Sequence, residues 1–312
     1  MTHFADRLAD AVRRCGNPLC VGLDPRWESL PWEIRARHKG ESLAQVAAAF
    51  EEFGRRVIDI VGDRVPILKP QAAFFEACGP DGFRAMARLL DHARSRGVLT
   101  LLDAKRGDIA STASAYADAA FAGTAIAGRV HPVWQADALT VNPYLGRDAV
   151  EPFITAARRV GAGVFVLVRT SNPGAGLFQD LVVKSEGPDR PLYQHVGQAV
   201  AGWARENLGA CGLGDVGAVV GATYPAEMAL LRQQMPEVVF LVPGFGAQGG
   251  TAEDTRPAFR ADGLGAVVNS SRGITFPFEP DDADWEARIE AALRDTIAAL
   301  GPLCSGASEP AV

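Results

Sequence analysis

The sequence predicts an α/β fold, a (β/α)8 TIM barrel with an extra N-terminal helix. Three observations favour it: eight short β-branched apolar segments recur along the chain, a helical stretch follows each of them, and no Pro-, Gly- or Ser-rich linker interrupts the series. We expect one barrel domain over residues 1–300 and a disordered tail over 301–312. An open, doubly wound sheet is the main alternative that the alternation leaves open.

The eight predicted strands are nearly continuous apolar runs, as expected for parallel strands that are covered on both faces. They span 19–24, 66–70, 98–103, 138–142, 163–169, 216–222, 238–243 and 264–269. The predicted helices between them are rich in alanine and arginine, for example 42–61, 81–97 and 190–209. The opening residues have the amphipathic pattern of a further helix.

Two connections are longer than a minimal barrel needs, at 25–41 and 172–190. Both follow the C-terminal end of a predicted strand, where barrel enzymes place lids and substrate loops. We expect 172–190 to be a mobile cover over the site.

Composition limits the partners of this chain. Its 31 basic and 37 acidic residues give a formal charge of −6 without a basic block, so we expect a small-molecule substrate rather than nucleic acid.

No apolar run approaches the roughly 20 residues that span a bilayer, and the start does not have the pattern of a signal peptide. We therefore expect no membrane association and a cytoplasmic location. The five cysteines contain no C-x-x-C pair and the five histidines are dispersed, so no metal site is predicted.

Most predicted strands end in a polar residue that a purely structural strand would not need. These residues are Asp24, Lys69, Asp103 with Lys105, Asn142, Arg169 with Thr170, and Asn269 leading to Arg272. Any one of them alone could be a solvated loop residue. Their recurrence on successive units favours a shared site, because the carboxyl ends of barrel strands converge on one face.

The densest polar cluster is the sequence DAKRGDI at 103–109. Side chains two apart on a strand point the same way, so Asp103 and Lys105 should both face the barrel mouth. With Asp108 from the turn and Lys69 from the neighbouring strand they would form an alternating array of two cations and two carboxylates. A salt-bridge network that only closes the barrel is the alternative, but buried ion pairs stabilise poorly, so catalysis explains the array better.

A glycine-rich stretch, VPGFGAQGG at 242–250, follows the seventh predicted strand. Glycines let backbone N–H groups approach phosphate oxygens, and barrels often bind phosphate with the loops after strands 7 and 8. Arg272 after the eighth strand is suited to grip a phosphate through two parallel hydrogen bonds. We therefore predict a phosphate site between these two loops.

Taken together, these motifs resemble the orotidine 5′-monophosphate decarboxylase family. The resemblance covers roughly residues 18 to 275 in the family's order. It is carried by LCVGLDP, ILKP, DAKRGDIAST and PGFGAQGG with the following arginine, and KPQAAFFE, TVNPYLG, RTSNPG and VNSSRGI are similar to the longer-chain bacterial branch.

The resemblance implies decarboxylation of orotidine 5′-monophosphate to uridine 5′-monophosphate without a cofactor. It makes Lys105 the proton donor, puts Asp103 beside the substrate carboxylate, and completes the charge array with Lys69 and Asp108. It also implies a homodimer, in which Asp108 and Thr112 reach the partner's site.

The same resemblance assigns the rest of the substrate. Asp24 and Lys69 would hold the ribose. Ser171, with Thr170, would hold the pyrimidine. Gln248 and Arg272 would hold the phosphate.

Three alternatives remain open at this point. One is a Mg²⁺-dependent sugar-phosphate decarboxylase or aldolase of the same superfamily, which would place an acidic metal ligand where this chain has Lys69. Another is a Schiff-base aldolase, which needs a neutral lysine that flanking carboxylates disfavour. The third is a catalytically silent nucleotide-binding barrel, which we would expect to have lost the charged array.

Overall fold

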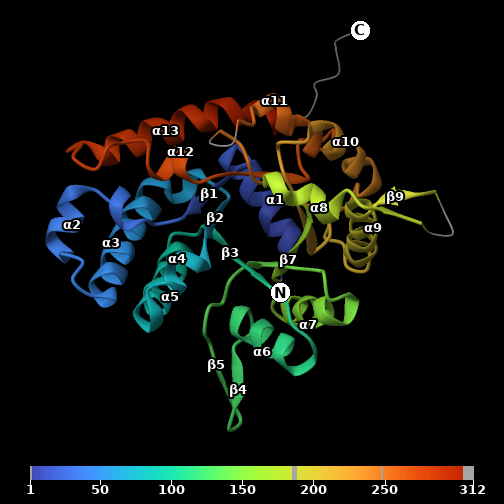
Figure 1. Cartoon of the computed structure of the whole chain (residues 1–312), viewed down its shortest axis with the longest axis horizontal. Coiled ribbons are helices and arrows are strands. Elements are labelled where there is room, and N and C mark those ends of the chain that lie inside the picture. The colour runs from blue at the N-terminus through green and yellow to red at the C-terminus, as the bar shows by residue number, and fades with distance from the viewer. Residues whose placement is uncertain (1, 185–187, 247–248, 305–312) are drawn as a thin grey trace.

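The computed structural model describes residues 2–184, 188–246 and 249–304, and a closed barrel of eight parallel strands forms its core (Figure 1). Each strand pairs with the next barrel strand along the chain, and the last pairs with the first. The strands are β1 (Leu19–Leu23), β2 (Ile67–Pro70), β3 (Leu99–Arg106), β6 (Ala138–Val141), β7 (Gly163–Arg169), β10 (Val216–Val220), β11 (Phe240–Val242) and β12 (Ala266–Ser270). All eight predicted strands are confirmed, and the open-sheet alternative is wrong because β12 closes on β1.

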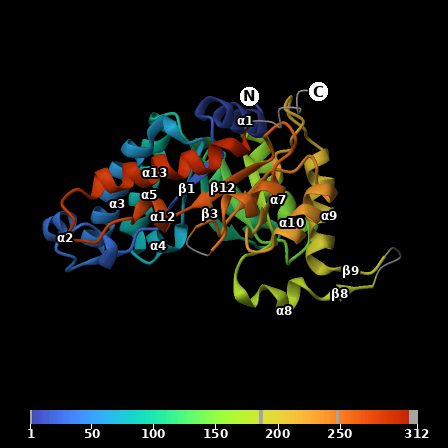
Figure 2. The ribbon, with the colours of Figure 1, turned by 90° about the horizontal axis from the view of Figure 1, so that it is seen from above.

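Helices surround this barrel (Figure 2). They are α3 (Leu43–Val61), α4 (Ala72–Glu76), α5 (Gly79–Ser95), α6 (Ala110–Ala120), α7 (Arg147–Val160), α9 (Leu192–Arg205), α10 (Pro225–Gln234), α11 (Ala252–Thr255), α12 (Arg272–Thr275) and α13 (Trp285–Leu300). The longest, α3, illustrates how the sequence sets their limits. The Ser42 side chain accepts a hydrogen bond from the amide of Gln45 at its start, and Gly62 follows its last residue with a φ of 43°.

Two apolar layers hold the barrel together. Alternate strand residues such as Ile67, Leu101 and Phe165 fill the interior, while their neighbours pack against the helices. The predicted extra helix, α1 (Phe4–Cys15), closes the N-terminal end of the barrel, and its Phe4 ring meets Phe165 edge-on at 6.0 Å. The C-terminal end of the strands, where the predicted site residues lie, is therefore left free of α1.

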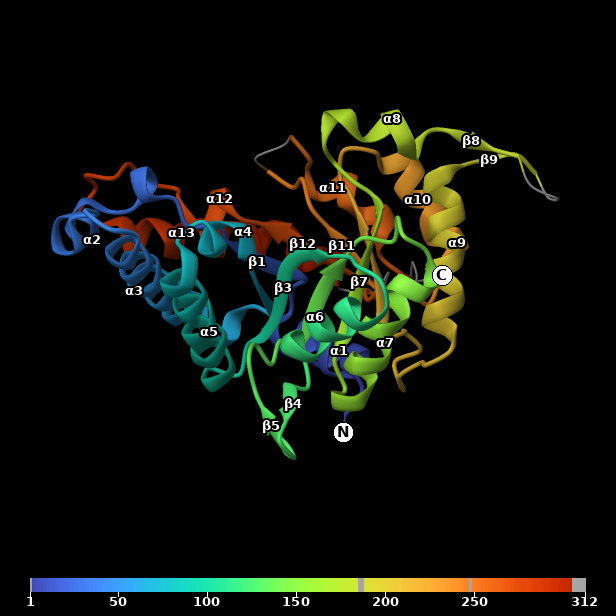
Figure 3. The same ribbon diagram turned by 60° about the horizontal axis from the view of Figure 1, so that its bottom comes forward.

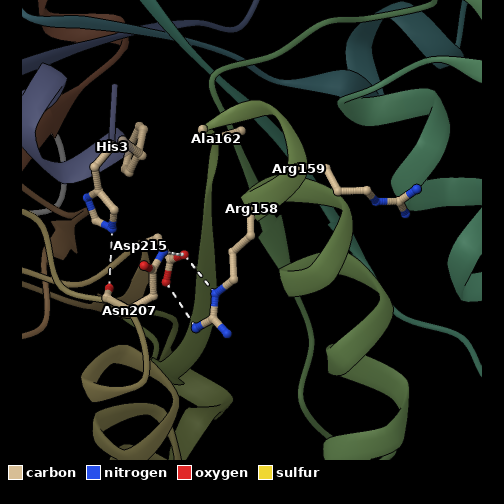
Figure 4. A pocket seen from close by; sticks show the side chains of 8 residues that line it. His3, Arg158, Arg159, Ala162, Asn207 and Asp215 are labelled. Carbon is tan, nitrogen blue, oxygen red and sulfur yellow. Dashed lines mark hydrogen bonds and ion pairs between the residues drawn. The ribbon is translucent and has the colours of Figure 1, made fainter. Parts of the chain in front are cut away.

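A polar network ties α1 to the barrel beside a pocket of about 330 Å³ at the starts of β7 and β10 (Figure 4). Arg158 makes two hydrogen bonds to Asp215, at 2.8 and 3.2 Å, and Asn207 donates a third. His3, next to α1, contacts the Asn207 carbonyl at 3.2 Å. Because these groups satisfy one another, we interpret the pocket as part of a structural anchor.

The long segment 25–41 does not form a lid. Its helix α2 (Trp32–His38) packs on the outside of α3, where His38 lies 2.7 Å from Glu52. The segment 172–190, in contrast, folds into α8 (Gly176–Gln179) and a small sheet of β8 (Val182–Val183) and β9 (Arg190–Pro191), which project from the barrel near α9 (Figure 2).

Two further features differ from the sequence-based expectation. A hairpin of β4 (Thr124–Ile126) and β5 (Arg129–His131) extends from the barrel between α6 and β6 (Figure 3). Residues 301–303, expected in a disordered tail, form a short 3-10 helix that buries Leu303, whereas 305–312 lie outside the described residues. No helix in the described part of the chain is long and apolar enough to cross a membrane.

Candidate active site

A layer of charged and polar side chains covers the apolar interior at the C-terminal end of the strands. Lys69, Asp103 and Thr140 each come two residues after an interior apolar residue on their strands, so the alternation of the strands points them inward as well. All three are buried. The barrel therefore positions this layer through the same periodicity that builds its core.

Asp103 is the centre of the layer. Its Oδ2 accepts hydrogen bonds from Lys69 Nζ at 2.9 Å and Gln71 Nε2 at 3.0 Å. Its Oδ1 accepts from Lys105 Nζ at 2.7 Å and Thr140 Oγ1 at 2.9 Å. Four donors around one buried carboxylate fix its position and compensate for its desolvation.

The charges of Asp103 and Lys69 stabilise each other. Burial alone would raise the pKa of Asp103, but the two neighbouring ammonium groups and their hydrogen bonds lower it below its usual range. Burial alone would lower the pKa of Lys69, but Asp103 and Asp24 raise it instead. We therefore treat Asp103 as an anion and Lys69 as a cation at neutral pH.

Lys105 has a backbone conformation that is unusual for a residue with a side chain. Its φ is 45°, and the pairing of β3 with β6 shifts register between Leu102 and Arg106. A left-handed residue of this kind costs roughly 1–2 kcal/mol. The Thr140 hydroxyl offsets this cost by accepting hydrogen bonds from the amides of Ala104 at 3.1 Å and Lys105 at 2.9 Å. Lys105 thus meets Asp103 as predicted, but through a bulge rather than simple alternation.

Exposure distinguishes the two lysines. The side chain of Lys69 is 6% exposed, whereas that of Lys105 is 47% exposed. Lys105 therefore presents more of its side chain to a molecule in the barrel mouth than Lys69 does.

Two buried oxygens at the mouth lack hydrogen-bond partners within the described residues. They are Oδ1 of Asp24, just after β1, and Oδ1 of Asn269 on β12. Unsatisfied buried acceptors are costly, so these two atoms are suited to receive hydroxyl or amine protons from a ligand.

Asp108 and Thr112 do not join the cluster within one chain. Asp108 Oδ1 accepts a hydrogen bond from the amide of Ile109 at 2.8 Å, and Thr112 is exposed on α6. Lys69, Asp103 and Lys105 meet, whereas no ion pair of Asp108 with these three is found among the described residues, so the array of four charges stays a prediction.

The glycine-rich loop and Arg272 follow the neighbouring strands β11 and β12, as predicted. Arg272 is the exposed first residue of α12. Three loop amides, those of Gly246, Gly249 and Gly250, donate to carbonyls within the loop, and binding of phosphate by this loop stays a prediction. Gln248 lies outside the described residues.

Thr170 follows β7 and borders a cavity of about 660 Å³, and Ser171 is the next residue along the chain. The cavity extends from Asn142 at the end of β6 to Gln179 of α8 and is otherwise mostly apolar. A flat, mostly apolar ring with a few polar atoms would fit such a surface.

The family model for the orotidine 5′-phosphate decarboxylase / HUMPS family matches residues 17–283. That range includes every strand of the barrel and all the side chains of the site described above. The chain belongs to this family.

Individual members of the family agree with the match. The chain is 48% identical to the orotidine 5′-phosphate decarboxylase of Rhodopirellula baltica over 94% of this chain and 97% of that protein. It is 41% identical to the enzyme of that name from Halobacterium salinarum, over 93% and 96% of the two chains. A solved structure of a putative orotidine 5′-phosphate decarboxylase from Streptomyces avermitilis superposes with a TM-score of 0.76 at 35% identity, covering 98% and 97% of the two chains.

Two residues that hold Asp103 in this decarboxylase, Gln71 and Thr140, were not among the predicted site residues. The signal was present, because Gln71 lies two residues after Lys69 and Thr140 two after Ala138 on a strand. Both were overlooked because neutral side chains at strand ends stand out less than charged ones.

Proposed function

We propose that Lys105 protonates C6 of the pyrimidine when this enzyme converts orotidine 5′-monophosphate to uridine 5′-monophosphate and CO2, the last step of pyrimidine biosynthesis. The observation that carries the proposal is the ammonium of the half-exposed Lys105 side chain, held at 2.7 Å by a buried carboxylate at the barrel mouth. Lys69 is less suited to proton donation because its side chain is buried, with its ammonium paired to Oδ2 of Asp103.

In the reaction, the bond between C6 and the carboxylate breaks and its electron pair stays on C6. An ammonium about 4 Å from that pair stabilises it by about 4 kcal/mol at an effective dielectric near 20. Lys105 then gives one proton to C6, forms the new C–H bond and recovers a proton from solvent. Positioned proton donation is worth roughly 10²- to 10⁴-fold, so electrostatic stabilisation must supply much of the rest.

Asp103 has two tasks in this mechanism. It orients both ammonium groups, and it faces the substrate carboxylate, whose negative charge it repels until CO2 leaves. The four donors that hold Asp103 keep it charged and in place during this step.

The remaining contacts follow the family resemblance. Asp24, with an unpartnered buried oxygen, and Lys69 hold the ribose hydroxyls. Ser171, with Thr170 beside it, holds the pyrimidine, and Gln248 and Arg272 bind the phosphate. Phosphate binding far from C6 supplies energy that orders the site, so we count it toward turnover as well as affinity.

The properties of Lys69 disfavour two of the alternatives. Its ammonium occupies the end of β2, where the Mg²⁺-dependent relatives place an acidic ligand, and it is paired with Asp103. The raised pKa of Lys69 keeps it protonated, which disfavours a Schiff-base nucleophile. The intact cluster of Lys69, Asp103 and Lys105 disfavours a silent nucleotide-binding barrel.

Purified wild-type enzyme is expected to convert orotidine 5′-monophosphate at the same rate with and without EDTA, because the proposed mechanism uses protein ammonium groups. Absorbance of the pyrimidine measures the rate, and a hexulose phosphate with Mg²⁺ is the comparison substrate. Turnover of the sugar phosphate but not of the nucleotide by folded enzyme would overturn the proposed function.

We further propose a homodimer in which Asp108 and Thr112 complete the partner's site. Their placement supports this, because Asp108 makes no ion pair with its own cluster among the described residues and Thr112 lies exposed on α6. Asp108 would supply the second carboxylate of the array in trans.

Complementation tests the shared site. Lys105→Ala and Asp108→Ala homodimers should each be nearly inactive, but co-expression should restore about one quarter of wild-type activity, since half the dimers are mixed and each mixed dimer has one intact site. Different affinity tags on the two chains allow the mixed dimer to be isolated and assayed. No activity in an isolated mixed dimer would contradict the shared site.

A further inference from the structure

Two consecutive residues of the segment 172–190 attach it to the end of β7. Gln179 bonds Thr170 twice: its Oε1 accepts from the Thr170 amide at 3.0 Å, and its Nε2 donates to the Thr170 hydroxyl at 2.8 Å. The next residue, Asp180, pairs with Arg169 at 2.8 Å. The C-terminal end of α8 is therefore hydrogen-bonded and ion-paired to the two residues that precede Ser171.

Arg169 gives this attachment a rigid base. Its side chain is 2% exposed and lies between two aromatic rings, 4.1 Å from the centroid of Tyr224 and 5.2 Å from that of Tyr193. A guanidinium held in this way loses much of its freedom and gains cation–π stabilisation. The contacts of Arg169 thus fix the end of β7, immediately before Thr170 and Ser171.

The bonds to Gln179 also determine what Thr170 can offer a ligand. The Thr170 hydroxyl has one proton, which it donates to Asn172 Oδ1 at 2.7 Å while accepting from Gln179. Ser171 is half-buried, and no hydrogen bond of its hydroxyl is found among the described residues. Gly221 lies directly behind Ser171, since a Cβ on Gly221 would come within 2.8 Å of the Ser171 Cβ.

From these contacts we propose that Gln179 is a positioning residue for recognition of the nucleobase. It engages Thr170 at both backbone and hydroxyl and thereby fixes the backbone from which the adjacent Ser171 offers its hydroxyl to the pyrimidine. Thr170 then serves as part of the support rather than as a ligand. This inference rests on the proposed function, in which the pyrimidine lies beside these residues.

A base-specific binding experiment tests it with the full-length enzyme. Gln179→Ala is expected to weaken competitive inhibition by uridine 5′-monophosphate about tenfold, the effect of two lost hydrogen bonds, and to raise KM for the substrate similarly. Inhibition by ribose 5-phosphate, which lacks the base, should not change. Gln234→Ala is the matched control, because Gln234 is also half-buried and its side chain donates to Gln194 on the outer helices. It should change inhibition by neither compound.

A double-mutant cycle shows whether Gln179 acts through Thr170. Thr170→Val and Gln179→Ala together should weaken uridine 5′-monophosphate binding no more than the larger of the two single effects. The loss of uridine 5′-monophosphate binding caused by Ser171→Ala should add to the loss caused by either of the other two substitutions. An equal loss for both inhibitors in Gln179→Ala, or additive effects of Thr170→Val and Gln179→Ala, would overturn the inference. A wild-type enzyme that binds ribose 5-phosphate but not the nucleotide would instead overturn the proposed function.

Discussion

Lys105→Ala is expected to lower kcat by at least about 10⁴-fold, because it removes both the proton donor and the cation that stabilises the C6 electron pair. The loss should appear mainly in kcat, since the ribose and phosphate contacts remain. The variant should also fold normally, because the side chain is 47% exposed and alanine keeps the Cβ, so the cost of the left-handed backbone does not change. Single-turnover kinetics with saturating enzyme would measure this residual rate.

Lys105→Arg separates the charge from the proton. Arginine keeps a cation near Asp103 but does not release a proton in the accessible pH range. We expect it to remain at least about 10²-fold below wild type, because only the proton-transfer contribution is lost. Wild-type turnover by Lys105→Arg would show that charge alone suffices and would contradict the role of Lys105 as donor.

Asp103→Asn is expected to damage both stability and catalysis. It removes the carboxylate that pairs directly with the 6%-exposed Lys69, and breaking a buried pair in this way costs about 3–5 kcal/mol in the free energy of unfolding. The two ammonium groups also lose their alignment, which should lower kcat by about 10²- to 10³-fold. Urea unfolding at pH 7 and steady-state kinetics measure the two effects. Asp91→Asn changes an exposed carboxylate on α5 and serves as the control. It should change the free energy of unfolding by no more than a few tenths of a kcal/mol and should leave kcat unchanged.

The stability difference between wild type and Asp103→Asn should also depend on pH. The folded protein lowers the pKa of Asp103 below the unfolded value of about 3.9, so its charge stabilises the fold fully above that pH. As the pH falls below about 4, the unfolded chain takes up the proton first and the difference should narrow. A difference that grows toward acid would contradict the assignment of Asp103 as a buried anion.

The barrel was predictable because its signals are local and repeated. Each strand is an apolar run covered on both faces, and the polar residue after each run marks the end where the site lies. Lys69 and Asp103 were predicted to face inward on the same grounds, and strand alternation also points to Gln71 and Thr140.

Other parts of the site depend on contacts that no local pattern encodes. The bulge at Lys105 exists because the Thr140 hydroxyl, from the neighbouring strand β6, accepts hydrogen bonds from two backbone amides of β3. In a regular parallel pair these amides would donate to backbone carbonyls instead. The bonds of Gln179 to Thr170 require a fold in the segment 172–190, whose sequence predicts only a loop. The β4–β5 hairpin was missed for a related reason, since its short strands carry no alternating pattern.

Hydrogen exchange at C6 of the product tests the role of Lys105 most directly, because protonation and its reverse pass through the same group. The probe is uridine 5′-monophosphate with fluorine at C5, whose electron withdrawal makes the C6 proton more acidic, incubated with enzyme in D2O and followed by NMR. We predict that the wild type replaces the C6 hydrogen with deuterium and that Lys105→Ala does not, although both bind the nucleotide. Exchange at the wild-type rate by Lys105→Ala would contradict Lys105 as the proton donor.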